Sequence, residues 1–225
     1  MRAGGADTAF AESIELSSFL SRLPMVGVEQ KEDVVRMIPD DVIPVLQAAK
    51  VDFVLVGAHG ASGFLLEPRS TQDVDFMLKK RDVARASAGV LKKFPELELE
   101  KHPDVWRYKR GKQYVLDLML ANIPLHKRVM KEFQEIRMGR RIVKVPKIES
   151  ALAMKFAAMT GHYRIAEKKH SDASDFISMV KKADKMGKVV DLALLSELAE
   201  LHYVGGGTEI RQYVADVRAG RTLQV

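Results

Sequence analysis

The sequence contains no cysteine, so it has no disulfide bond, no thiolate metal ligand and no cysteine nucleophile. It also lacks any apolar run near the roughly 20 residues that a membrane-spanning helix needs. Near the start, Glu12 and Glu15 interrupt the continuous apolar segment that a secretion signal requires. These absences predict a soluble protein of the cytoplasm with no membrane partner.

Neither sign of charge dominates the chain. Lys and Arg number 36 and Asp and Glu number 30, which gives a formal net charge of +6. This moderate excess is compatible with a polyanionic partner such as RNA or a nucleotide, but it is equally common in proteins that bind neither. Charge alone therefore indicates no function.

Apolar residues are plentiful. With 225 residues, 47% of them hydrophobic, the chain can form one large globular domain or two small ones. Short β-branched and apolar runs predict strands at 51–56 and 72–79, then two hairpins that pair 104–109 with 113–120 and 133–137 with 140–145. Helical spacing predicts helices at 8–23, 29–37, about 40–50 with Asp40 or Asp41 as the cap, and 81–94.

After Pro146 the pattern is helical, with predicted helices at 147–161, 171–187, 191–203 and 207–218. We therefore predict an α+β fold in which helices flank a mixed sheet and a helical domain follows. The predicted divisions are an N-terminal helical segment (1–38), an α/β core (39–146) and a C-terminal helical domain (147–225).

Three aspartates carry the strongest chemical signal. Asp73 and Asp75 alternate with apolar residues, so they share one face of a strand, and Asp117 lies inside a second apolar strand. If the two strands are neighbours, three carboxylates converge, and such hard oxygen ligands suit Mg²⁺ or Mn²⁺. The alternative is that Asp73 and Asp75 face solvent from a polar strand and that Asp117 pairs with a lysine or arginine.

A glycine turn precedes these aspartates. Gly57, Gly60 and Gly63 follow a predicted strand, where backbone N–H groups at the start of a helix favour anions. A dinucleotide-binding fold is the alternative, but its glycine spacing is GxGxxG rather than GxxGxxG. A dinucleotide-binding fold would also require one acid at the end of a strand, for the ribose, rather than two acids within the strand.

Taken together, the turn Val56-Gly57-Ala58-His59-Gly60-Ala61 and the block Arg69-Ser70-Thr71-Gln72-Asp73-Val74-Asp75 resemble the nucleotidyltransferase superfamily. The likeness is greatest to minimal nucleotidyltransferases of the AbiEii toxin type, whose Arg-x-Thr-x-Asp-x-Asp pattern is complete here. Asp117 is similar to the third carboxylate of that family. The resemblance covers residues 50–180 and includes a looser helical pattern: Glu149, Lys155, Arg164, Lys168, Lys169, Asp172 and Asp175.

The resemblance implies transfer of a nucleoside monophosphate from a nucleoside triphosphate (NTP) to an acceptor hydroxyl. Asp73 and Asp75 would hold two metal ions, and Asp117 would complete the second metal site and could accept the proton of the acceptor. The implied nucleotide-binding residues are Gly57, Ala58, Thr71, Lys155, Arg164 and Lys168. A solvated basic helix face is the alternative for the last three of these residues.

Two further residues are interpreted as structural. Arg69 is expected to fix the turn by bonding to backbone carbonyls, and His59 is expected to be a hydrogen-bonded structural histidine rather than a ligand.

The sequence leaves the acceptor open among RNA, a protein side chain and a small molecule. If the protein acts as a toxin, a cognate antitoxin protein is an expected partner. Ala58 stands where the family usually has Gly or Ser, which motivates the alternative of a catalytically weakened relative that only binds nucleotide, RNA or protein. A second alternative is phosphoryl transfer by the same site.

Overall fold

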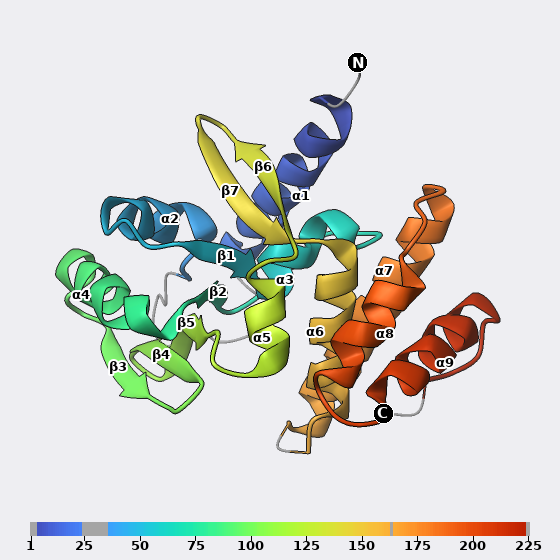
Figure 1. The fold of residues 1–225 in the computed structure, drawn as a ribbon. Coiled ribbons are helices and arrows are strands. Elements are labelled where there is room, and N and C mark those ends of the chain that lie inside the picture. Colours follow the sequence, from blue (N-terminus) through green and yellow to red (C-terminus); the bar gives the residue numbers. More distant parts are fainter. Residues whose placement is uncertain (1–3, 24–35, 163, 224–225) are drawn as a thin grey trace.

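A computed structural model of the protein describes residues 4–23, 36–162 and 164–223. Within these ranges, five strands form one mixed sheet and two more form a separate ribbon (Figure 1). The sheet contains, in chain order, β1 (Phe53–Val56), β2 (Val74–Leu78), β3 (Glu98–Lys101), β4 (Val105–Arg110) and β5 (Gln113–Leu120). Their order across the sheet is β1-β2-β5-β4-β3.

One parallel pairing decides where the aspartates lie. β2 runs parallel to β5, while every other neighbouring pair in this sheet is antiparallel. A parallel pair needs a long crossover, and here the chain between the two strands forms a helix and the β3–β4 hairpin. The register places Asp75 directly beside Asp117.

The helices that flank the sheet are α1 (Gly4–Arg22), α2 (Pro39–Ala48), α3 (Gly57–Ala61), α4 (Val83–Lys93) and α5 (Pro124–Val129), with 3₁₀ turns η1 (Ser62–Phe64) and η2 (Lys80–Asp82). The ribbon consists of β6 (Phe133–Met138) and β7 (Arg141–Pro146), and it packs against β1 and α1. The helices after the ribbon are α6 (Ile148–Thr160), α7 (Ala166–Lys185), α8 (Leu192–Glu200) and α9 (Gly206–Arg218), which lie together on one side of the sheet (Figure 1).

The predicted fold class, both predicted hairpins and the four helices after Pro146 are confirmed. Several boundaries differ, since α7 begins at residue 166 rather than 171 and β1 begins at residue 53 rather than 51. The expected helix at 29–37 falls largely outside the described residues. The divisions at residues 38 and 146 stay predictions. None of the described helices is long and apolar enough to cross a membrane.

Three local predictions were wrong or incomplete. Neither Asp40 nor Asp41 is the N-cap of α2, because the helix begins at Pro39 and Ile38 is its N-cap. The Asp41 carboxylate instead accepts a hydrogen bond from the Ile38 N–H. The short elements β3 and α5 were not predicted. β3 is rich in charged residues and lies at the edge of the sheet, so it lacks the apolar pattern of a buried strand.

The N-terminal helix α1 packs against the core and supports the chain that leads into β2. Phe10 meets Phe64 edge to face, with ring centroids 4.9 Å apart. Ser17 Oγ donates to the carbonyl oxygen of Arg69 over 2.7 Å, and Ser21 Oγ accepts from the Thr71 N–H over 2.9 Å. Two serines of α1 therefore fix the backbone just before Asp73.

His59 contacts the same serine of α1. Its Nδ1 lies 3.1 Å from Ser17 Oγ, whose single hydrogen is already donated to Arg69, so Nδ1 is the donor. Its Nε2 is buried and has no hydrogen-bond partner among the described residues. Burial lowers the pKa of His59 to about 4, and the nearby Arg69 charge adds to this effect. The interpretation of His59 as a hydrogen-bonded structural histidine is confirmed.

We predict that His59 makes the fold sensitive to acid. Between pH 6.5 and pH 4 the unfolded chain binds a proton that the folded protein does not, so the free energy of unfolding falls as the pH falls, by about 2–3 kcal/mol. His59→Asn keeps a donor near Nδ1 but cannot titrate, and it should lose this component. Urea unfolding of both proteins between pH 7 and pH 4 measures the difference, with His170→Asn, at an exposed site, as the control. Parallel pH profiles for wild type and His59→Asn would contradict the prediction.

Candidate active site

Three carboxylates converge at the β2–β5 pair. Asp73 directly precedes β2, Asp75 lies within it, and Asp117 lies within β5. One oxygen from each residue can be chosen so that all three lie within 4.8 Å of one another. The two strands are thus neighbours, and the three acids face one point. Thr71 Oγ1 donates to Asp73 Oδ1 over 3.0 Å, which orients that carboxylate.

Burial and the repulsion between neighbouring carboxylates raise the pKa of two of these acids. Burial raises the pKa of Asp75 well above its ordinary value, and the neighbouring charges of Asp73 and Asp117 raise it further. Burial also raises the pKa of Asp117 to about 6, although the Arg107 guanidinium opposes this rise. A cation placed between the three carboxylates would relieve both effects, because it stabilises the ionised forms.

Arg107, which the sequence analysis missed, partly balances the site. It is the cross-strand neighbour of Asp117 on β4, and its Nε lies 3.3 Å from Asp117 Oδ2. The alternative that Asp117 pairs with an arginine is therefore correct for one oxygen. The other oxygen, Oδ1, is buried and has no hydrogen-bond partner among the described residues, although Asp117 is only 7% exposed.

The unsatisfied Oδ1 of Asp117 indicates whether the three aspartates could hold a divalent ion. A buried carboxylate oxygen without a partner is costly, and an oxygen-only ligand set with several negative charges matches Mg²⁺ or Mn²⁺ rather than a softer metal. The three aspartates therefore fit such an ion.

Gly57 leaves room for the Asp75 carboxylate. Its φ is +63°, and a Cβ built on it would lie 1.8 Å from Asp75 Oδ2. Both the backbone conformation and the close approach therefore require glycine. Ala58 is the next residue of the short helix α3 and is almost fully buried.

Two buried acids of α7, Asp172 and Asp175, form an ion-pair cluster beside the three aspartates with Lys155 of α6, Arg164 of the α6–α7 connection and Arg69. Lys155 Nζ lies 2.8 Å from Asp172 Oδ1 and 2.7 Å from Asp175 Oδ2. Arg164 Nε lies 2.5 Å from Asp172 Oδ2, and Arg69 makes two 2.8 Å hydrogen bonds to the Asp175 carboxylate. Three cations thus face two acids, which leaves one positive charge in excess toward the site.

Arg69 has the structural role that was predicted, but with a different main partner. It donates to the Ser70 carbonyl oxygen over 3.1 Å, and it also clamps Asp175 on α7. A solvated helix face is the wrong description for Lys155, which is 8% exposed. Lys168 is exposed and has no ion pair among the described residues.

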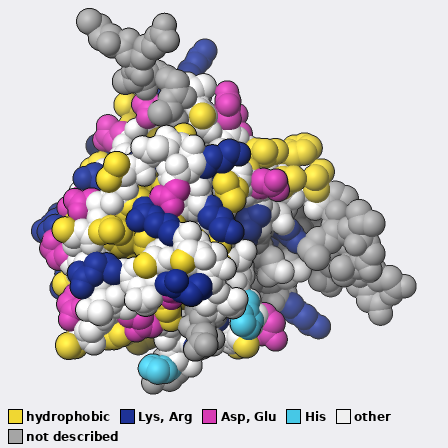
Figure 2. Space-filling view, turned by 90° about the vertical axis from the view of Figure 1, so that its right-hand side faces the viewer, with side chains coloured by type: hydrophobic (Ala, Val, Ile, Leu, Met, Phe, Trp, Pro, Cys, Tyr) yellow, Lys and Arg dark blue, Asp and Glu magenta, His cyan; other side chains and the backbone are white. Residues whose placement is uncertain are grey.

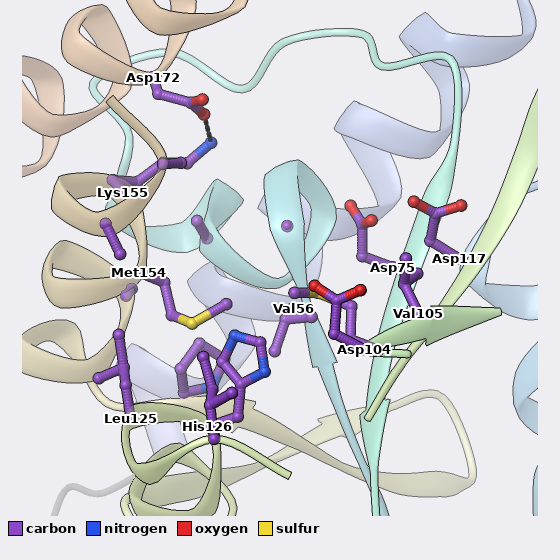
Figure 3. A pocket seen from close by; sticks show the side chains of 18 of the residues that line it. Val56, Asp75, Asp104, Val105, Asp117, Leu125, His126, Met154, Lys155 and Asp172 are labelled. Carbon is purple, nitrogen blue, oxygen red and sulfur yellow. Dashed lines mark hydrogen bonds and ion pairs between the residues drawn. The ribbon is translucent and has the colours of Figure 1, made fainter. Parts of the chain in front are cut away.

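Two cavities meet at the carboxylates. The first, of about 390 Å³, is polar, and its lining includes every residue that the sequence analysis proposed for metal or nucleotide: Gly57, Ala58, Thr71, Asp73, Asp75, Asp117, Lys155, Arg164 and Lys168. The second, of about 360 Å³, adjoins the first at the same acids, and its lining is more apolar than that of the first (Figure 3). Residues that line both are Gly57, Asp75, Arg107, Asp117, Lys155, Arg164 and Asp172.

Comparison with known proteins gives similar structures but no family. No protein-family model and no curated protein matches the chain. An antigenic nucleotidyltransferase-like protein from Paracoccidioides brasiliensis matches 78% of this chain and 90% of its own, with 18% identity and a TM-score of 0.47. The antibiotic-resistance factor ANT(2'')-Ia matches 80% and 93%, with 13% identity and a TM-score of 0.48. The lincosamide antibiotic adenylyltransferase LnuA matches 64% and 99%, with 16% identity and a TM-score of 0.45.

We predict that Gly57→Ala separates the backbone cost of the turn from its effect on Asp75. Gly139→Ala is the matched control, because Gly139 has a φ of +57° and a Cβ there would meet nothing within 4 Å. Each variant should lose about 1–2 kcal/mol of unfolding free energy for the left-handed backbone. Gly57→Ala should also displace the Asp75 carboxylate and weaken Mn²⁺ binding by about tenfold or more, equivalent to about 1.4 kcal/mol.

Thermal unfolding and titration of Mn²⁺ followed by electron paramagnetic resonance measure the two effects. Equal Mn²⁺ affinity in Gly57→Ala and Gly139→Ala would show that the Asp75 carboxylate does not take part in ion binding.

Proposed function

We propose that this protein is a metal-dependent nucleotidyltransferase that moves a nucleoside monophosphate from an NTP to an acceptor hydroxyl. The observation that carries the proposal is the unsatisfied buried oxygen of Asp117, which lies among three converging carboxylates. A polar cavity with basic residues opens directly onto these carboxylates. Anionic ligands bound to a divalent ion need such a combination, because the triphosphate shares the coordination of the metal.

Each residue of the site has a distinct role in this proposal. Asp73, Asp75 and Asp117 would hold Mg²⁺ or Mn²⁺, which when bound neutralises charge on the triphosphate and on the leaving pyrophosphate. Thr71 fixes the orientation of the Asp73 carboxylate. Gly57 keeps space open for the Asp75 carboxylate.

The basic residues divide into two groups. Lys155 and Arg164 are paired with Asp172 and join α6 to α7, and the cluster that they form with Arg69 and Asp175 carries one positive charge in excess beside the cavity. The Lys168 amine is exposed at the rim and is free to contact phosphate oxygens.

The proposed reaction is a displacement at the α-phosphorus of the NTP. The acceptor oxygen forms a new bond to this phosphorus, and the bond from the phosphorus to the bridging oxygen of pyrophosphate breaks. The hydroxyl proton passes to the Asp117 carboxylate, and pyrophosphate leaves with the electron pair of the broken bond.

We predict that the three acids are needed for ion binding but not for folding. Asp75→Asn and Asp117→Asn should each weaken binding of Mn²⁺-ATP by about tenfold or more and abolish transfer. Because each substitution removes a repelling, buried charge, thermal stability should stay equal or rise. Calorimetric titration, thermal unfolding and transfer of labelled nucleotide measure these outcomes. Asp184→Asn, which alters the exposed pair with Arg218, is the control.

Three outcomes of these measurements would contradict the proposal. Unchanged Mn²⁺-ATP affinity in the two aspartate variants would remove the metal site. Tight binding without turnover would favour the catalytically weakened relative that Ala58 motivates. A mass increase of one phosphate on the acceptor, rather than one nucleotide, would identify a phosphotransferase.

We predict that Lys168 and Lys155 have separable roles. Lys168→Ala should raise the KM for NTP several-fold, about 1 kcal/mol of lost charge interaction, and leave the melting temperature unchanged. Lys155→Met should instead destabilise the fold by about 3–5 kcal/mol, because it leaves Asp172 and Asp175 short of a buried counter-charge. Urea unfolding and steady-state kinetics distinguish the two effects. A stability loss in Lys168→Ala, or none in Lys155→Met, would contradict this division.

The finer assignments from the sequence resemblance belong to this proposal as well. They are membership of the AbiEii-type group, action as a toxin of a toxin–antitoxin pair, an antitoxin protein as partner, and a place in the cytoplasm. RNA is one candidate acceptor among hydroxyl-bearing molecules.

A further inference from the structure

The apolar cavity beside the carboxylates includes a set of lining residues to which the proposed triphosphate site assigns no role. It lies between the strands that carry the acids and the helices α5 and α6 (Figure 3). Its volume of about 360 Å³ is within the range of pockets that enclose small organic ligands. A molecule in this cavity would lie against Asp75 and Asp117, which also line the polar cavity.

Aliphatic side chains form one part of the cavity wall, away from the charged residues that it shares with the polar cavity. Val56, Leu125 and Met154 project into it from β1, α5 and α6 (Figure 3). The histidines that line it carry no fixed charge near neutral pH, because burial lowers the pKa of both His126 and His202 below its ordinary value. His126 Nδ1 is also engaged with the Leu120 carbonyl oxygen at 3.1 Å.

One acid of the lining has no counter-charge. Asp104 is exposed, lines the apolar cavity together with Asp75 and Asp117, and has no ion pair among the described residues (Figure 3). Four acids line the cavity (Asp75, Asp104, Asp117 and Asp172) against three cations (Arg107, Lys155 and Arg164), and each of these cations is already ion-paired. The lining of the polar cavity instead carries six cations against four acids, so the apolar cavity disfavours a phosphodiester or a carboxylate relative to the polar one and accepts a neutral or singly cationic group.

Among the residues that the structure describes, the cavity has few of the features with which proteins bind single-stranded RNA. Its described lining includes the rings of His126 and His202 but no Phe, Tyr or Trp, so it provides no large aromatic surface on which a base could stack. On the face drawn in Figure 2, basic, acidic and apolar side chains are interspersed rather than gathered by type. That face therefore provides no continuous basic track for a phosphate backbone.

We propose that the apolar cavity is the acceptor subsite, and that the acceptor is a small hydroxylated molecule with an aliphatic body and a neutral or singly cationic group. This inference rests on the proposed nucleotidyl transfer and names its substrate class. The aliphatic body packs against Met154 and Leu125, the cationic group faces Asp104, and the hydroxyl points toward Asp117. In the balanced step, the acceptor oxygen bonds to the α-phosphorus of the NTP, its proton passes to Asp117, and pyrophosphate leaves.

Matched probes test the chemistry of the cavity. The probes are three cyclohexanes with a hydroxymethyl group at position one. They differ in the group at position four, which is aminomethyl (cationic), a second hydroxymethyl (neutral) or carboxylate (anionic). Saturation-transfer-difference NMR on the full-length protein should detect the cationic and neutral probes, and binding of the anionic probe should be weaker by about tenfold or more. Asp104→Asn should reduce this preference for the cationic over the anionic probe.

Filling the cavity provides the second arm of the test. Ala157→Leu and Ala158→Leu add volume to half-buried positions in the cavity lining. Both variants should bind the cationic probe about tenfold or more weakly than the wild type, with unchanged affinity for Mn²⁺-ATP. Ala88→Leu, on the exposed face of α4, is the control and should change neither the affinity for the cationic probe nor that for Mn²⁺-ATP. With Mn²⁺ and an NTP mixture present, mass spectrometry should detect one nucleotide added to the hydroxymethyl group of the cationic probe.

Three results would overturn the inference. Loss of Mn²⁺-ATP binding in the two cavity-filling variants would show that the cavity holds part of the nucleotide. Transfer to a single-stranded ribo-oligonucleotide, blocked by Ala157→Leu while no probe binds, would identify RNA as the acceptor. If the wild type binds the cationic probe but no Mn²⁺-ATP, the proposed function itself has failed, and the acceptor assignment fails with it.

Discussion

The parallel pairing of β2 with β5 is the constraint on which the rest of the structure depends. It places Asp75 beside Asp117, and the chain leading into β2 adds Asp73, so three carboxylates meet at half-buried and buried positions beside one cavity. Such an arrangement is unfavourable unless a cation balances it. The support around it maintains this geometry: Gly57 leaves space for one carboxylate, and Ser17 and Ser21 of α1 fix the backbone just before Asp73.

The helical half is joined to this site through charge rather than apolar packing alone. Asp172 and Asp175 of α7 bind Lys155 of α6 and Arg69 of the loop before β2, so one buried cluster links the element that bears the acids to the helices that flank them. Breaking one member would leave a buried charge uncompensated. The residues that resemble phosphate ligands therefore have a structural role first, and Lys168 at the rim is the basic residue with the most freedom to meet a ligand.

The sequence was sufficient to predict the elements whose apolar patterns are regular and the residues that share a strand face. The alternation around Asp73 and Asp75 and the apolar run around Asp117 predicted two buried strands, and they are neighbours, but β2 begins at Val74, so Asp73 lies just before the strand rather than within it. Arg107 was missed because its position opposite Asp117 depends on the register of β4 against β5, which no local pattern specifies. The apolar cavity was missed for the same reason, since Leu125, Met154 and His202 are brought together only by the packing of α5, α6 and α8.

The central claim is that the three carboxylates bind divalent ions together with a triphosphate. The most direct measurement is a crystal structure of the wild-type protein with Mn²⁺ and a non-hydrolysable NTP analogue, with anomalous scattering data collected at the manganese absorption edge. We predict an anomalous peak bonded to oxygens of Asp73, Asp75 and Asp117, with the phosphates in the polar cavity. Manganese density elsewhere, with Asp117 paired only to Arg107, would contradict it.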